Sequence, residues 1–303
     1  MDKVNKLELR RIQLFLAFTF TITYAWTMLL VWPRVLGKDT AALTQEETAV
    51  NTMLIAVMMF FPAVGVLFTR LVTREGFKDS MLHLNLRGNV RYYLIAWIGP
   101  IVLTLLGTIA YYICFPSDFS LAAFRGLDIE NAAMVYGTIV VMLFAPLFNL
   151  VPCLGEEWGW RGYLLPKLAN RMSFLSAALL TGLIWGVWHA PIIVAGHNYG
   201  FGYSAYPWLG IAAMCVFCIV VGMLLAYVTL RTKSCWPAVL AHGAINGTAV
   251  LGMLFYNSLG FIENPNLDIV NSFIGPMPVG IIGGFAYIVV AVWIVLKMRK
   301  ASN

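Results

Sequence analysis

The sequence predicts an all-α, polytopic membrane protein with about eight transmembrane helices and both termini in the cytoplasm. Of its 303 residues, 60% are hydrophobic and only 11% are charged, whereas a soluble domain carries about 25% charged residues. The apolar residues gather into long runs, and the basic residues gather between alternate pairs of runs. Because no repeat or low-complexity tract divides the chain, we expect a single integral membrane domain over residues 1–303.

The predicted helices follow from the apolar runs. A helix needs about 20 mostly apolar residues to cross the hydrocarbon layer. The first run lacks the small-residue cleavage site of a signal peptide, so we interpret it as an uncleaved span. Prolines fall at or near the ends of several runs, where a helix tolerates them. The runs cover residues 12–32, 50–70, 92–115, 132–153, 173–194, 208–230, 236–257 and 278–296.

The distribution of basic residues indicates the orientation, because Lys and Arg accumulate in cytoplasmic connections. With the N-terminus inside, the inner segments hold 17 of the 20 Lys and Arg residues, and only Arg34, Lys38 and Arg125 lie outside. Topology alone therefore explains the net charge of +6. We expect the lipid bilayer as a partner and no nucleic acid.

Three of the predicted helices carry polar side chains at membrane depth. A charge at the bilayer centre costs about 2.5–3.5 kcal/mol on insertion scales, so such residues persist where they pair or function. At 1.5 Å per residue, all of them fall within the roughly 30 Å hydrocarbon layer. They are Glu156, Glu157 and Arg161, in a fourth helix that continues past Pro152; His189 in the fifth; and His242 with Asn246 in the seventh.

Helical spacing separates the two carboxylates. Glu157 and Arg161 are four residues apart with the acid first, which is the favoured order for a helical ion pair. Glu156 points about 100° away from Glu157, so it is free to face His189, His242 and Asn246.

These residue types suit hydrolysis by an activated water. A carboxylate beside a neutral imidazole can remove a proton from a bound water, and a second histidine with an amide can donate to the developing oxyanion. An alternative is a zinc site, with Glu156, His189 and His242 as three ligands and water as the fourth. The sequence has no HExxH motif, and it leaves both alternatives open.

The order of three motifs resembles that of the CPBP family of intramembrane proteases, which includes CAAX prenyl proteases of the Rce1 type and bacterial Abi-like relatives. The motifs are EExxxR at Glu156–Arg161, WxxxH at Trp185–His189 and HxxxN at His242–Asn246. The resemblance covers about residues 146–250, which it marks as the catalytic core. Trp185 stands where the family usually has Phe, and we expect it to keep a packing role.

The resemblance also implies roles for these residues. Glu156 matches the catalytic glutamate, and His189 matches the histidine that positions and activates the water. His242 and Asn246 match the oxyanion-stabilising pair, while Glu157 and Arg161 match supporting positions. The implied mechanism is of the glutamate type and requires no cofactor. The family was formerly described as metallopeptidases, so Zn²⁺ is the alternative.

The implied function is that of an intramembrane endopeptidase, a hydrolase that cleaves a peptide bond from a cytoplasm-facing cavity. Its substrate would be a peptide or protein, either prenylated or otherwise membrane-associated. We expect a multi-pass protein of the plasma membrane of a prokaryote. The alternative is a non-catalytic membrane scaffold, or a peptide-binding or immunity protein, that uses the same polar residues structurally.

Overall fold

The computed structural model describes residues 3–38, 43–121, 129–256 and 273–302. These residues form helices and no β-strand, which confirms the all-α prediction. In chain order the elements are α1 (Lys3–Trp26), η1 (Thr27–Val31), α2 (Trp32–Val35), α3 (Gln45–Met58), α4 (Phe61–Val72), α5 (Val90–Cys114), η3 (Pro116–Asp118), α6 (Ile129–Phe148), α7 (Leu150–Gly159), η5 (Trp160–Leu164), α8 (Leu165–Ala169), α9 (Phe174–Trp188), α10 (Ala190–Val194), α11 (Trp208–Thr232), α12 (Trp236–Thr248), η6 (Leu251–Phe255) and α15 (Phe285–Ser302).

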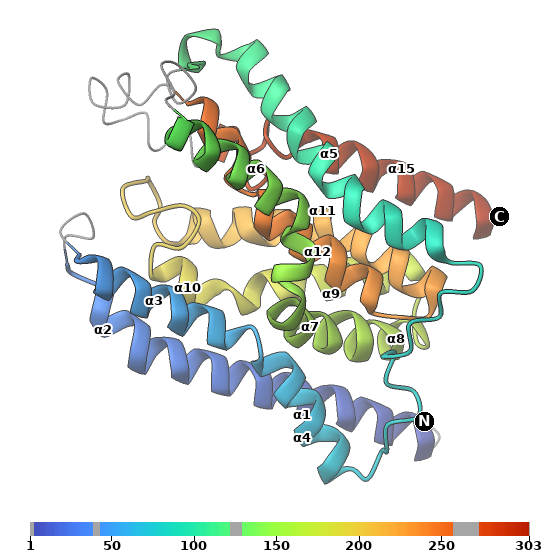
Figure 1. Cartoon of the computed structure of the whole chain (residues 1–303). Helices are drawn as coiled ribbons and strands as arrows, with labels where there is room; N and C mark the ends of the chain where they lie inside the picture. Colours follow the sequence, from blue (N-terminus) through green and yellow to red (C-terminus); the bar gives the residue numbers. More distant parts are fainter. Residues whose placement is uncertain (1–2, 39–42, 122–128, 257–272, 303) are drawn as a thin grey trace.

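Six helical segments in the described residues are long and apolar enough to cross a membrane, or seven if the bent pair α6 and α7–α8 counts as one span. These correspond to the first seven predicted runs. The eighth run corresponds to α15, which has 18 residues including Lys297, Arg299 and Lys300 and is not among the candidate spans. The two ends of the chain lie at the same end of the bundle (Figure 1). The count of eight and the cytoplasmic location of the termini stay predictions.

Side-chain caps explain where two of the spans begin. Thr44 forms a capping box before α3: its hydroxyl accepts from the Glu47 amide at 3.2 Å, and the Glu47 carboxylate accepts from the Thr44 amide at 2.9 Å. Ser173 precedes α9, and its hydroxyl accepts from the Ser176 amide at 3.1 Å. Such caps satisfy N–H groups that the first turn of a helix leaves without partners.

The fourth span is bent at the point where it approaches the polar residues. The axis turns by 42° between Phe148 and Leu150. Pro152 lacks an N–H and cannot donate to the Phe148 carbonyl four residues earlier, which weakens the helix there. Beyond the bend the helix continues through α7, the π-helical turn η5 and α8 to Ala169, which confirms that it extends past Pro152.

Helices α9 and α12 occupy the middle of the bundle, with α1, α3 and α4 on one side and α5 and α15 on the other (Figure 1). Glycines permit the close approaches. A Cβ at Gly155 of α7 would lie 2.6 Å from the Met59 carbonyl oxygen, and one at Gly182 of α9 would lie 2.7 Å from the Ile219 Cα. Small residues at helix contacts allow such backbone proximity in membranes.

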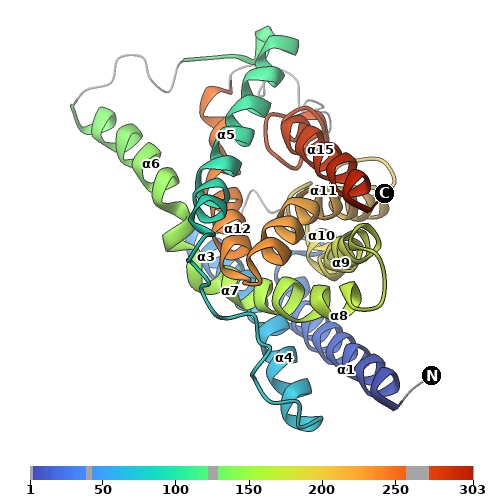
Figure 2. The same ribbon diagram turned by 90° about the vertical axis from the view of Figure 1, so that its right-hand side faces the viewer.

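Helix α6 stands at the edge of the bundle and packs mainly on α12 (Figure 2). Its large apolar side chains are exposed, among them Val140, Phe144 and Phe148. In a bilayer this surface would contact lipid, since soluble proteins rarely expose continuous apolar patches of this kind.

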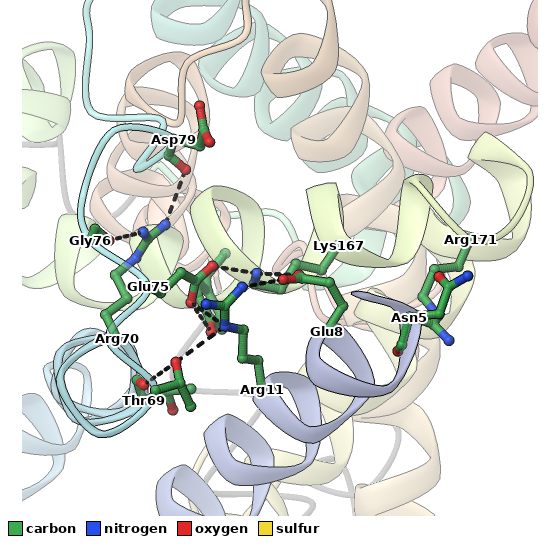
Figure 3. A network of polar contacts seen from close by, with 12 residues as sticks. Asn5, Glu8, Arg11, Thr69, Arg70, Glu75, Gly76, Asp79, Lys167 and Arg171 are labelled. Carbon is green, nitrogen blue, oxygen red and sulfur yellow. Dashed lines mark hydrogen bonds and ion pairs between the residues drawn. The ribbon is translucent and has the colours of Figure 1, made fainter. Parts of the chain in front are cut away.

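A polar network ties three elements together at the end of the bundle that holds the termini (Figure 3). Lys167 of α8 donates to Glu8 of α1 at 2.6 Å and to Glu75, which follows α4. Arg11 pairs with Glu8 and lies 3.6 Å from Glu75, while the Tyr163 hydroxyl donates to Glu75 at 2.8 Å. The network therefore joins the first two spans to the end of the fourth.

Candidate active site

Four of the polar residues singled out from the sequence line one cavity of about 130 Å³. Glu156 comes from α7, His189 from the C-terminal end of α9, and His242 and Asn246 from α12. Glu156, His189 and His242 are buried, whereas Asn246 is exposed. The structure thus brings together side chains that lie up to 90 residues apart in the sequence. The cavity wall is mainly apolar, and these polar groups give a space of this size the hydrogen-bond partners that water needs.

Glu156 is held by one of its two oxygens. Its Oε2 accepts a hydrogen bond of 2.7 Å from the indole N–H of Trp185. Its Oε1 has no hydrogen bond with any of the described residues. A carboxylate oxygen in the wall of a cavity and without a protein partner is available to a water molecule.

The tautomer of His189 follows from its hydrogen bond. Its Nδ1 lies 2.8 Å from the Trp185 carbonyl oxygen. Because a carbonyl only accepts, Nδ1 must donate, which leaves Nε2 of the neutral ring as an acceptor. His189 therefore offers a lone pair, and Glu156 a free oxygen, in the walls of the same cavity.

Glu157 links the ion pair to the candidate site. Its Oε1 accepts from Arg161 at 2.8 Å and from His242 Nδ1 at 2.9 Å, and both Glu157 and Arg161 are fully buried. The ion pair expected from the spacing is present. Glu156 shares the cavity with His189 and His242, whereas the hydrogen bond of His242 to Glu157 was not predicted.

Trp185 contacts several of these residues at once. Besides its bond to Glu156, its ring lies 4.1 Å below the Arg161 guanidinium carbon and meets the His242 ring edge-on at 5.3 Å between centroids. A cation held over an indole is attracted by the ring's quadrupole, most strongly when water is excluded. Sequence reasoning assigned Trp185 a packing role and missed its hydrogen bond.

Asn246 lies one helical turn after His242 on α12, as the spacing predicts. Its amide nitrogen approaches the sulfur of Cys153 at 3.9 Å, which is a weak interaction. The amide is therefore free to donate to a ligand in the cavity.

The three candidate zinc ligands do not form a metal-binding group as they stand. Glu156, His189 and His242 each use one polar atom in a hydrogen bond to protein. Among the residues with described positions, no three His, Cys, Asp or Glu side chains are placed to share a metal ion. Zinc stays an alternative that metal analysis must decide.

Sequence analysis did not single out His197 and Asn198 as site residues. Both line the cavity beside His189. The loop turns back at Gly196 and Gly200, whose φ angles of +82° and +69° favour glycine. Those two glycines after the WxxxH motif were the sequence feature that could have predicted a loop turning back toward the site.

The position of this loop bears on where the cavity opens. The loop at 195–207 lies at the end of the bundle opposite the two termini (Figure 1). If the termini are cytoplasmic, the loop beside the cavity is on the outer side. Cytoplasmic termini and a cytoplasm-facing cavity are therefore hard to reconcile, and both stay predictions.

Comparison with known proteins identifies the central part of the chain. The model of a family described as type II CAAX prenyl endopeptidase Rce1-like matches residues 135–248. This segment is similar to the Rce1-like family. The resemblance to the CPBP family drawn from the three motifs is thereby confirmed, and the matched range includes all of them.

Two curated relatives agree with this result. The chain is 31% identical over 93 residues to CAAX prenyl protease 2 of Methanococcus maripaludis, covering 30% of this chain and 34% of that protein. It is 27% identical over 139 residues to lysostaphin resistance protein A of Staphylococcus haemolyticus, covering 46% of this chain and 33% of that protein. The chain thus spans about a third of each relative's length.

Proposed function

We propose that this Rce1-like protein is an intramembrane endopeptidase that uses Glu156 to activate a water for peptide-bond hydrolysis. The observation that supports this most is the state of Glu156. It is 3% exposed, lines the cavity, and has one oxygen bonded to Trp185 and the other without a partner among the described residues. A buried carboxylate at membrane depth without an ion pair is costly and usually functional.

In the proposed reaction, a water binds between Glu156 Oε1 and His189 Nε2. Glu156 takes a proton as the water oxygen attacks the carbonyl carbon of the scissile peptide bond. Asn246, and His242 when its Nε2 carries a proton, donate to the oxyanion that forms. Glu156 then returns the proton to the departing amide nitrogen, so that the C–N bond breaks and an amine and a carboxylic acid leave.

We propose a peptide or protein anchored in the membrane as the substrate, with a prenylated C-terminus as the first type to test. A relative's name, CAAX prenyl protease 2, motivates this choice. The long apolar helices that carry these residues support a site at membrane depth. We further propose that this bilayer is the plasma membrane of a prokaryote.

The test uses purified protein in liposomes with a farnesylated C-a-a-X peptide and its unmodified counterpart. We expect mass spectrometry to detect a released tripeptide from wild type, and none from Glu156→Gln or His189→Ala. The methanococcal relative serves as the positive control. Absence of product from wild type under conditions where that control cleaves would refute the proposal, as would undiminished cleavage by Glu156→Gln.

The same preparation separates the glutamate mechanism from the zinc alternative. We propose that activity persists when the metal content is far below one ion per chain and after treatment with a chelator. Loss of activity on chelation, with recovery on adding Zn²⁺, would instead support Glu156, His189 and His242 as metal ligands.

A second candidate function is supported by the resemblance to lysostaphin resistance protein A. In this case the protein acts as a scaffold or immunity protein, and the polar residues serve structure alone. Expression in a lysostaphin-sensitive staphylococcal strain tests it. Equal resistance from wild type and Glu156→Gln would favour the non-catalytic role, whereas resistance lost with Glu156→Gln would favour catalysis.

A further inference from the structure

Trp185 contacts both Glu156 and His189, the two residues of the proposed water-binding site. Its indole N–H donates to Glu156 Oε2 at 2.7 Å, and its backbone carbonyl accepts from His189 Nδ1 at 2.8 Å. The side chain of one residue thus contacts the proposed base, while its backbone contacts the histidine that shares the water.

We propose that Trp185 is a positioning residue that fixes the rotation of the Glu156 carboxylate: by binding one oxygen, it holds the other toward the water bound to His189. This inference rests on the proposed function of Glu156. The packing role expected from the sequence does not include this hydrogen bond, which a phenylalanine at the same position could not make.

The carboxylate needs such a partner because its terminal torsion is soft. The last χ angle of a glutamate is broad and roughly two-fold, in contrast to the staggered torsions before it. Among the described residues, Trp185 is the sole hydrogen-bond partner of Glu156. Without the indole N–H, the carboxylate would rotate, and the oxygen beside the water would no longer be held in the attacking geometry that proximity effects require.

The indole is itself held in place. Trp185 is 3% exposed, and the Arg161 guanidinium lies over its ring at 4.1 Å. Arg161 is in turn bonded to Glu157, which also accepts from His242. Glu157 and Arg161 therefore stabilise the Trp185 ring that positions Glu156. In this way Trp185 connects the carboxylate of Glu157 to that of Glu156.

The substitution Trp185→Phe isolates the effect of the indole, because it leaves the backbone carbonyl that orients His189 unchanged. A matched control is Trp158→Phe. Trp158 also lies close to Glu156 in the sequence, and its indole N–H donates to the Ser80 carbonyl at 3.0 Å outside the cavity. Both variants lose a large ring and one hydrogen bond to oxygen.

We expect Trp185→Phe to lower kcat for the farnesylated peptide by about 10- to 100-fold, the range for a hydrogen bond to a charged group. KM should change by less than about twofold, since an interaction that orients the base acts mainly in the transition state. Trp158→Phe should keep kcat within about twofold of wild type. Equal kcat values for the two variants would overturn the proposal.

A double-mutant cycle distinguishes positioning from a general loss of structure. In Glu156→Asp the carboxylate is one methylene shorter and withdraws from the indole. Adding Trp185→Phe to that variant should therefore cost less than about threefold in kcat, because coupled residues are not additive. If Trp185→Phe lowered kcat by the same factor in wild type and in Glu156→Asp, Trp185 would not act through Glu156. Full activity of Glu156→Gln would instead refute the proposed function itself.

Discussion

The substitution Glu157→Gln should separate stability from catalysis when it is compared with Glu156→Gln. The two residues are neighbours and both are buried, yet their partners differ. Glu157 Oε1 accepts from Arg161 and His242. Glu156 accepts from Trp185 and forms no ion pair with any described residue.

The expected loss follows from these contacts. Removing one member of a buried ion pair costs about 3–5 kcal/mol, because the other charge stays buried without compensation. A glutamine oxygen could still accept from one of the two donors, and Arg161 keeps its contact with the Trp185 ring, so we expect the lower end, about 3 kcal/mol. At about 2–4 °C per kcal/mol this lowers the Tm by about 6–12 °C. For Glu156→Gln, whose carbonyl can still accept from Trp185, we expect a loss of at most about 1 kcal/mol.

A thiol-reactive dye measures this unfolding in detergent. Cys153, Cys218 and Cys235 are buried free thiols that become reactive when the bundle opens, whereas exposed Cys114 supplies the baseline. Glu157→Gln should melt well below wild type, and Glu156→Gln should melt close to wild type while losing activity. Melting temperatures for the two variants within about 2 °C of each other would refute the assignment of the buried charge pair.

Three further predictions concern other parts of the structure. Gly182→Ala should lower the free energy of unfolding by about 1–3 kcal/mol and reduce turnover, because its Cβ would meet Ile219 of α11. The control is Gly137→Ala, which has open space around it and should leave stability unchanged or raise it by up to about 1 kcal/mol. Dye-monitored melting compares the two variants. Lys167→Met should lower stability by about 1–3 kcal/mol, because Glu8 and Glu75 both lose their cationic partner. The loss should change little with salt, since Lys167 and Glu75 are each only 11% exposed and partly buried pairs are screened weakly; a loss that high salt abolishes would contradict this. Burial lowers the pKa of His197, so the folded protein resists its protonation: its contribution to stability is complete above about pH 6.5 and declines below it. His197→Asn should therefore flatten the Tm between pH 7 and 5, and an unchanged slope would contradict the assignment.

Much of the fold could be predicted from the sequence because the bilayer constrains it strongly. Apolar runs of span length must be helical in lipid, where every backbone polar group needs an internal partner. The convergence of Glu156, His189 and His242 could also be anticipated, since the cost of isolated polar groups at membrane depth favours their grouping. The three motifs then indicated the family.

The partners within the site could not be predicted. Helical geometry separates Glu156 from Glu157 by about 100°, but it does not state which of them faces α12. That depends on the bend at Asn149 and on the contact of Gly155 with Met59. These features are tertiary, so the sequence could not indicate that His242 bonds to Glu157.

The network around Lys167 has a consequence for how this protein can be recombined with its relatives. Lys167 lies inside the family-matched range 135–248, whereas its partners Glu8 and Glu75 lie outside it. A chimera that grafts this range onto the first two helices of another protein would separate a cation from both of its acids. Exchange of the N-terminal helices therefore has to preserve acids at both positions, because residues outside the family-matched range are chemically matched to a residue inside it.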